Sequence, residues 1–269
     1  MIARILHVSD LHVGTGEDRQ LEEALAGLVE RTAPDLLIAS GDLTHRGRRH
    51  QHEHAHAILT SLGRPVLAVP GNHDLPYTVP ARFTHPWREF ERLWGTVEPV
   101  HATPALHVVG LNSARPFRHQ GGALGRRQLE RAAERLERAP AGAYRVVALH
   151  HHLLGAPWRA SRKRPVAHRG RVLRELVAAG ADLVVGGHIH QSAVSECREF
   201  EVVASDARSA VVATAPGLGR PRPNRLGEAS GLQVYEVSAE SLTVLTHTLL
   251  GTDWALTARR TFPRKPSTL

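Results

Sequence analysis

Short apolar segments that end in Asp, Asn or His constrain this chain more than any other feature of its sequence. Five of them have the endings Asp10-Leu11-His12, Gly41-Asp42, Gly71-Asn72-His73-Asp74, His150-His151-His152 and Gly187-His188-Ile189-His190. Helical patterns separate most of the apolar segments, and this alternation predicts βαβ units in an α/β fold. Ligands of such folds gather at the carboxyl ends of the strands. The polar endings are therefore expected to converge on one site.

The predicted strands of this sheet are rich in Val, Leu and Ile. They are Ile2–Val8, Leu36–Ala39, Val66–Val69, Leu106–Val109, Val146–Leu149 and Leu183–Val185. Amphipathic helices are predicted from apolar residues at three- and four-residue steps. The three clearest sets are Leu21, Leu25 and Leu28, then Leu129, Ala133 and Leu136, then Val172, Leu173 and Leu176.

Beyond His190 the pattern changes to apolar runs with no convincing helix between them. These runs are Glu201–Ala204, Ala210–Ala213, Leu232–Val237 and Leu242–Leu249. They predict an antiparallel extension, which could form the second sheet of a sandwich, because no Pro/Gly/Ser linker precedes them. We therefore expect one domain over residues 1–258 and a flexible tail over residues 259–269.

Composition narrows the class of protein. With 269 residues and 42% hydrophobic content, the chain can bury a substantial core. We expect no signal peptide, because a predicted strand begins at Ile2, and no membrane helix, because charged residues, Gly or His interrupt every apolar stretch. The single cysteine, Cys197, excludes an internal disulfide and a cysteine-based zinc site. A cytoplasmic location is the resulting expectation.

The net charge of +8 raises the question of a nucleic-acid partner. All but two of the 34 cationic residues are arginine, which indicates a compositional preference as much as a dedicated basic groove. Nucleic acid therefore stays the less favoured partner. The basic run from Trp158 to Arg171 is either a phosphate-binding lid or a solvated loop, and the sequence leaves both open.

The chain contains 19 histidines, so a single H-x-H pair carries little information. About one such pair is expected by chance at this composition. His50, His52, His54 and His56 lie in a predicted helix, where i,i+4 pairs could bind a metal, but a solvated helix face is the favoured interpretation. Chance does not explain the five different endings described above, each after its own strand.

The ordered set D-x-H, GD, GNHD, H and GHxH resembles the pattern of the calcineurin-like metallophosphoesterases, from Ile5 to His190. The resemblance implies a four-layer αββα sandwich with mixed sheets. It also implies two metal sites that share Asp42. One cation would be held by Asp10, His12, Asp42 and His190, and the other by Asp42, Asn72, His150 and His188.

Imidazole and carboxylate ligands suit two divalent ions such as Mn, Fe, Co, Ni or Zn. Such a pair can polarise a phosphoryl oxygen and activate water for in-line displacement. The resemblance places His73 beside the phosphate as the catalytic residue, with Asp74 orienting it. His151 is the second choice for the ligand position given to His150, and a weak candidate for substrate binding. Asn112 and Arg115 are further weak substrate-binding candidates, with a structural role equally open.

Among these enzymes, the sequence is most similar to bacterial class III cyclic nucleotide phosphodiesterases. Gly41-Asp42-Leu43-Thr44 and Leu111-Asn112-Ser113-Ala114-Arg115 follow that group's order. We therefore predict hydrolysis of a cyclic nucleotide or another small diester, without membrane association. The oligomeric state is open, with a homodimer as one alternative.

Other functions stay open. Leu6 to Gly14 also resembles the opening motif of repair exonucleases. A phosphomonoesterase or a pyrophosphatase acting on a nucleotide-linked substrate would use the same metals. A metal-binding interaction protein without turnover is the alternative from another class.

Overall fold

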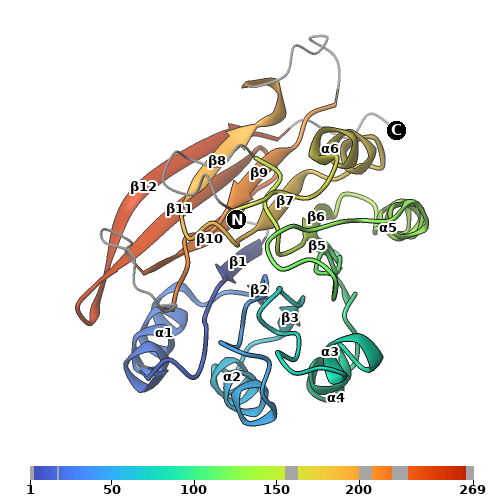
Figure 1. Ribbon diagram of the computed structural model, residues 1–269. Coiled ribbons are helices and arrows are strands. Elements are labelled where there is room, and N and C mark those ends of the chain that lie inside the picture. The colour runs from blue at the N-terminus through green and yellow to red at the C-terminus, as the bar shows by residue number, and fades with distance from the viewer. Residues whose placement is uncertain (1–2, 17, 155–162, 200–207, 220–229, 265–269) are drawn as a thin grey trace.

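The computed structural model describes residues 3–16, 18–154, 163–199, 208–219 and 230–264 of the chain. Two six-stranded sheets lie face to face, and helices pack on part of the outer face of each (Figure 1). The α/β class and the four-layer sandwich with mixed sheets are therefore confirmed. None of the helices in these ranges has the length and apolar character needed to cross a membrane.

The first sheet has the strand order β12-β11-β10-β1-β2-β3. Its strands are β1 (Ala3–Val8), β2 (Leu36–Ala39), β3 (Val66–Ala68), β10 (Gly231–Val237), β11 (Ser241–Leu250) and β12 (Asp253–Pro263). β1, β2 and β3 run parallel to one another, so their carboxyl ends meet at one edge. The C-terminal strands extend this sheet in antiparallel fashion from β1.

The second sheet has the order β4-β5-β6-β7-β9-β8. Its strands are β4 (Val100–Ala102), β5 (Leu106–Gly110), β6 (Tyr144–Ala148), β7 (Leu183–Gly186), β8 (Ala193–Glu196) and β9 (Val211–Thr214). The four central strands are parallel, and the two edge strands are antiparallel. The carboxyl ends of β6 and β7 therefore lie together, as those of β1 and β2 do.

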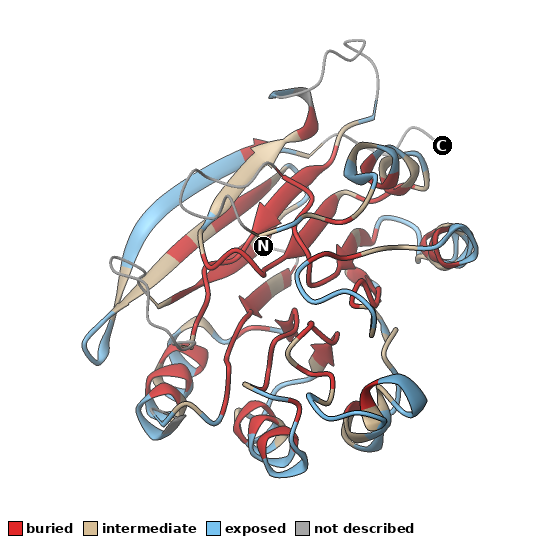
Figure 2. Ribbon diagram, in the orientation of Figure 1, coloured by how far each residue is buried: buried red, intermediate tan, exposed pale blue. Residues whose placement is uncertain are grey.

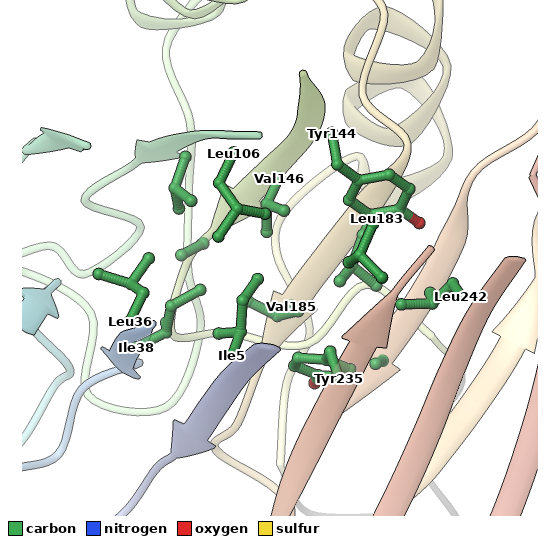
Figure 3. Packing of buried hydrophobic residues seen from close by; sticks show 14 of the residues in the cluster. Ile5, Leu36, Ile38, Leu106, Tyr144, Val146, Leu183, Val185, Tyr235 and Leu242 are labelled. Atoms are coloured by element: carbon green, nitrogen blue, oxygen red, sulfur yellow. The ribbon is translucent and has the colours of Figure 1, made fainter. Parts of the chain in front are cut away.

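Alternate residues of the strands pack on opposite faces of each sheet. Ile5 and Ile38 lie in the core between the sheets, whereas their neighbours Leu6 and Leu37 pack under the outer helices. Figure 3 shows Ile5, Leu36 and Ile38 of the first sheet facing Leu106, Val146 and Val185 of the second. Because both faces of these strands are buried, the sequence reads as continuous apolar runs (Figure 2).

The helices are α1 (Asp18–Thr32), α2 (Arg49–Ser61), α3 (Ala81–Thr84), α4 (Arg88–Trp94), α5 (Arg126–Glu137) and α6 (Arg169–Ala178). α1 and α2 pack on the first sheet, and α5 and α6 pack on the second. The three predicted amphipathic helices are confirmed, with one shift. In α5 the buried alanine is Ala132, whereas the predicted Ala133 is half-buried. Ala132 follows Leu129 by three residues and precedes Leu136 by four, so it lies on the same buried face of the helix.

The C-terminal boundary differs from the expectation. β12 continues to Pro263 and pairs with β11 there, and Phe262 is buried opposite Leu242. A tail therefore does not begin at residue 259. The exposed Arg259 and Arg260 made this part of the sequence look like a tail, although they lie on an edge strand. The predicted strand Glu201–Ala204 and residues 265–269 lie outside the described part of the chain.

Truncation of a side chain between the sheets tests this packing. Leu183 is fully buried in the core, at the end of β7 that is remote from His188. Leu183→Ala should lower the free energy of unfolding by about 2–5 kcal/mol, because it removes buried methyl groups and leaves a cavity. Urea denaturation measures the loss. The control Leu256→Ala, at a side chain that is 54% exposed, should cost far less; equal losses would contradict the packing.

Candidate metal centre

The loops after β1 and β2 stay hydrogen-bonded beyond the ends of the strands. The amide of Asp10 donates to the Gly41 carbonyl at 2.9 Å, and the amide of His12 donates to the Asp42 carbonyl at 2.9 Å. This pairing fixes the D-x-H and GD segments side by side. The Leu218 and Gly219 amides then donate to the Ser9 and Asp10 carbonyls, so a segment after β9 covers the same loop.

Most of the candidate ligands have a backbone conformation that is unusual for residues with a side chain. Five of the seven have positive φ angles: Asp10 (55°), His12 (48°), Asp42 (49°), His188 (74°) and His190 (55°). Each such residue costs about 1–2 kcal/mol. Strain of this kind persists only where the surrounding structure imposes it, and it clusters at functional sites. Among the described residues other than glycine, only Ala33 and His168 share this conformation without being predicted metal ligands.

One group of side chains surrounds Asp10. Its Oδ1 lies 3.0 Å from His190 Nε2 and 3.8 Å from His12 Nε2. The two ring nitrogens are 3.3 Å apart. Three side chains from two distant parts of the sequence thus direct their ligand atoms at one point.

A second group surrounds His150. Its Nε2 lies 3.2 Å from Asn72 Oδ1, 3.2 Å from His188 Nδ1 and 3.4 Å from Asp42 Oδ1. These four side chains come from the ends of β2, β3, β6 and β7. Both sheets therefore contribute to this group.

Asp42 connects the two groups through its two carboxylate oxygens. Oδ1 faces His150 at 3.4 Å, and Oδ2 faces His12 Nε2 at 3.9 Å. Oδ2 is buried and has no hydrogen-bond partner among the described residues. A buried carboxylate oxygen without a donor is expensive unless a cation binds it. This arrangement fits a carboxylate shared by two cations.

Neighbouring groups fix the orientation of the ligands. Asp10 Oδ2 accepts hydrogen bonds from Ser9 Oγ at 2.7 Å and from the His188 amide at 2.9 Å. His150 Nδ1 donates to the Ser40 carbonyl at 2.8 Å, and His188 Nε2 donates to the Gln120 carbonyl at 3.0 Å. Each imidazole thereby keeps its other nitrogen, the one that faces the cluster, free to bind a cation.

The pKa values of the clustered side chains are set by their burial and by the contacts between carboxylates and imidazoles. Burial alone would raise the pKa of Asp42, but the His150, His73 and His12 rings together outweigh it, so this pKa lies well below its usual range. Burial alone would lower the pKa of His150, but the Asp42 and Asp10 carboxylates and the Ser40 carbonyl together raise it to about 9. Burial lowers the pKa of His12 and His188, which keeps both imidazoles neutral. A cation at His150 would take the place of a proton.

The residues fit divalent metal ions. Groups of three side chains whose ligand atoms all lie within 4.8 Å of one another are Asp10–His12–His190, Asp10–Asp42–His150, His150–His151–His188 and His12–His45–His73. The first two share Asp10, and the second and third share His150. Nitrogen and oxygen ligands of this kind suit Mn, Fe, Co, Ni or Zn.

His73 lies at the rim of this cluster and is half-buried. Its amide donates to Asp42 Oδ1 at 2.8 Å, and its ring packs edge-on against the His12 ring at 4.7 Å. Its Nδ1 contacts the His45 carbonyl at 2.8 Å and the Tyr77 hydroxyl at 3.0 Å. The structure thus brings the predicted catalytic histidine to the ligands.

The expected role of Asp74 is wrong in one respect. Asp74 does not orient the His73 ring, which bonds to His45 and Tyr77 instead. The Asp74 carboxylate accepts hydrogen bonds from the amides of Gly71 at 2.8 Å and Thr44 at 2.9 Å. It therefore ties the GD loop to the GNHD loop. The sequence did not indicate His45 and Tyr77 as partners of His73, because neither residue belongs to one of the five ligand motifs.

The three weak substrate-binding candidates have different surroundings. Asn112 Oδ1 accepts from the Ala114 amide, and Arg115 bonds to the Asn112 carbonyl and to Gln128 of α5. These contacts favour the structural role of both residues. His151 is buried, with Nδ1 2.9 Å from Ser113 Oγ, and its ring lies 4.6 Å from that of His188. It lies next to the cluster.

The histidines of α2 stand apart from this cluster. His52 is buried and its Nε2 lies 3.1 Å from the Asp74 carbonyl, whereas His50 and His54 are exposed. No group of three metal-ligand side chains in the described ranges includes any histidine of α2. The interpretation of a solvated face therefore holds for His50 and His54 and is wrong for His52, whose ring is buried against the loop that contains Asp74. Of the basic run from Trp158 to Arg171, residues 158–162 lie outside the described part.

Comparisons with known proteins agree with this geometry. The family model of the calcineurin-like phosphoesterases matches residues 3–192, and the chain therefore belongs to this family. It is 29% identical over 211 residues to a protein of Rhodococcus erythropolis named as a probable cyclic nucleotide phosphodiesterase, covering 70% of this chain and 65% of that protein. It is 24% identical over 226 residues to the 3',5'-cyclic adenosine monophosphate phosphodiesterase of Haemophilus influenzae, covering 77% and 76%.

Other relatives share shorter stretches or the fold alone. A Synechococcus protein, also named as a probable cyclic nucleotide phosphodiesterase, is 29% identical over 129 residues, and the match spans about half of that protein (48%) and 45% of this chain. The purple acid phosphatase of yellow lupin superposes with a TM-score of 0.73 at 12% identity, over 97% of this chain and 54% of that chain. The latter likeness shows the same fold.

The glycine before Asn72 offers a test of the loop geometry. A Cβ added at Gly71 would lie 2.2 Å from Asp42 Oδ1 and 2.3 Å from the Asp42 nitrogen. Gly71→Ala should therefore displace Asp42 and lower the affinity for Mn(II) by at least about tenfold, as measured by isothermal titration calorimetry. Gly125→Ala is the matched control, because nothing lies within 4 Å of its added Cβ. An unchanged affinity in Gly71→Ala would show that the loops do not meet as described.

Proposed function

We propose that this protein hydrolyses small phosphodiesters at a centre of two divalent metal ions. Asp10, His12, Asp42 and His190 would hold one ion, and Asp42, Asn72, His150 and His188 the other. The observation that carries the proposal is the position of Asp42, whose two oxygens face the two groups of ligands at 3.4 and 3.9 Å. The metal pair would come from Mn, Fe, Co, Ni and Zn.

Two bound cations supply Lewis acidity, a lowered pKa of bound water and a clamp for an in-line displacement. The chain's own residues supply the rest. The buried carboxylates of Asp10 and Asp42 set the charge of the site, and hydrogen bonds from Ser9 and the His73 amide hold them in place. A preorganised site of this kind needs little rearrangement during the reaction.

His73 is the group best placed to assist the leaving oxygen. With Nδ1 donating to the His45 carbonyl, Nε2 is the ring nitrogen that remains for a substrate. A protonated Nε2 would donate to a phosphoryl oxygen or deliver a proton to the leaving group. The edge-on contact with His12 keeps the ring beside the ligands.

A cyclic nucleotide is the first substrate candidate, because two of the relatives that match most of the chain are named for that activity. Other small diesters come next. A nuclease, a phosphomonoesterase or a pyrophosphatase would use the same ligands, so the substrate has to be measured. A cytoplasmic location and the absence of membrane association stay predictions, and the oligomeric state stays open, with a homodimer as one alternative.

Metal reconstitution tests the activity. Protein stripped with a chelator and reloaded with Mn, Co, Ni, Fe or Zn should hydrolyse bis(p-nitrophenyl) phosphate and 3',5'-cyclic AMP faster than single-stranded DNA. Asn72→Ala should reduce kcat/KM more than about 100-fold with every metal, because it removes a ligand of the His150 group. Activity that survives in Asn72→Ala would point to a contaminating hydrolase, and no turnover with any metal would sink the proposal.

A comparison of leaving groups tests the role of His73. His73→Gln should reduce kcat by about 10²–10⁴-fold for 3',5'-cyclic AMP, whose alkoxide leaving group needs a proton. The loss should be much smaller for bis(p-nitrophenyl) phosphate, whose phenolate leaves without one. His50→Gln, at an exposed histidine of α2, is the control. Equal losses for both substrates would remove the proton-donor role and leave only a binding role.

A further inference from the structure

An arginine-lined groove lies next to the metal-ligand cluster. It is a surface hollow of about 620 Å³ at the start of α6. Its basic side chains are Arg118, Arg164, His168, Arg169, Arg171 and Arg174, and all six residues are exposed. The groove is distinct from the cluster, because none of the proposed metal ligands lines it.

The charge of this groove is mostly uncompensated. Arg171 pairs with Glu175 at 2.6 Å. In the part of the chain that the structure describes, Arg118, Arg164 and Arg174 form no ion pair with a carboxylate. Like charges that gather in a hollow repel one another, and an anion that enters relieves this repulsion. Guanidinium groups recognise phosphoryl oxygens with paired hydrogen bonds.

A short backbone segment separates the groove from the cluster. The Gln120 carbonyl accepts hydrogen bonds from His188 Nε2 at 3.0 Å and from the Arg164 amide at 3.3 Å. Gly121 lines the groove, and a Cβ added at the next residue, Gly122, would lie 2.6 Å from the His151 ring. One carbonyl oxygen thus stands between a proposed metal ligand and a residue of the groove.

We propose that this groove binds a phosphoryl group other than the one hydrolysed at the metal centre. The assignment of the ligand rests on the cavity and on Arg118, Arg164 and Arg174, which have no carboxylate partner among the described residues. Its closeness to His188 suits a second phosphoryl group on the same substrate, a point that rests on the proposed function. A free phosphate or polyphosphate has the same chemistry and is the other source.

Calorimetry on chelator-stripped protein tests the site without the metal centre. Tripolyphosphate should bind wild-type protein, more weakly as salt is added. In the double variant Arg164→Gln/Arg174→Gln the Kd should rise at least about tenfold, because two charge-assisted contacts are lost. Arg164→Lys/Arg174→Lys, which keeps the charge, should retain part of the binding. The control Arg19→Gln/Arg126→Gln alters two arginines outside the groove, and thermal unfolding checks that all variants fold.

Two substrates that differ in one phosphate identify the source. The dinucleotides ApA and pApA share one diester, and pApA carries an additional terminal phosphate. If the groove binds the terminal phosphate of the substrate, the KM of the wild-type protein should be at least about tenfold lower for pApA than for ApA. In the Arg164→Gln/Arg174→Gln variant the two KM values should be nearly equal. If the wild-type protein binds tripolyphosphate but has nearly equal KM values for ApA and pApA, the ligand of the groove is a free anion.

Two results would overturn the proposal: no tripolyphosphate binding by the stripped wild-type protein, or equal weakening in the groove and control variants. If no diester is hydrolysed with any metal, the proposed function fails, whereas the calorimetry still decides whether the groove binds phosphoryl groups.

Discussion

The burial of Asp10 and Asp42 at one edge of two facing sheets is the constraint on which the rest of this structure depends. Two carboxylates out of water are costly unless positive charge and hydrogen-bond donors accompany them. The structure supplies the donors from Ser9, the His188 amide and the His73 amide. The remaining oxygens face imidazoles, and Asp42 Oδ2 has no hydrogen-bond partner within the described ranges. Such a site favours the binding of cations.

The fold meets this constraint because parallel strands end together. β1, β2 and β3 bring three loops to one edge of the first sheet, and β6 and β7 bring two loops to the second. The packed layer between the sheets fixes the position of one edge relative to the other. The strained backbone at Asp10, Asp42 and His188 is tolerated because this core fixes it.

The sequence predicted much of the fold, because strands buried on both faces appear as unbroken apolar runs. Leu36–Ala39 matches β2 residue for residue. Edge strands were harder to predict from the sequence. β8 is half-buried along its length, and β12 exposes Arg259 and Arg260, so neither carries a continuous apolar signal. The short helices α3 and α4 were missed because they bury few side chains, of which Phe90 is the deepest.

The candidate ligands could be found from the sequence because each follows its own strand, and the structure brings all seven together. The contacts between the ligands and the residues around them could not be found in this way. The contact of His73 with the His45 carbonyl and the role of Asp74 depend on backbone atoms from different loops. The groove at α6 depends on Arg118 and Arg174, which are far apart in the sequence, lining the same hollow. Spacing along the sequence does not encode contacts of this kind.

The sharing of Asp42 between two cations is the central claim, and electron paramagnetic resonance of the Mn(II)-loaded protein tests it most directly. The account predicts two Mn(II) ions per chain and a multiline spectrum from exchange-coupled ions, which the isosteric Asp42→Asn should convert to that of uncoupled Mn(II). A single ion per chain, or an uncoupled six-line spectrum in the wild-type protein at full loading, would contradict it.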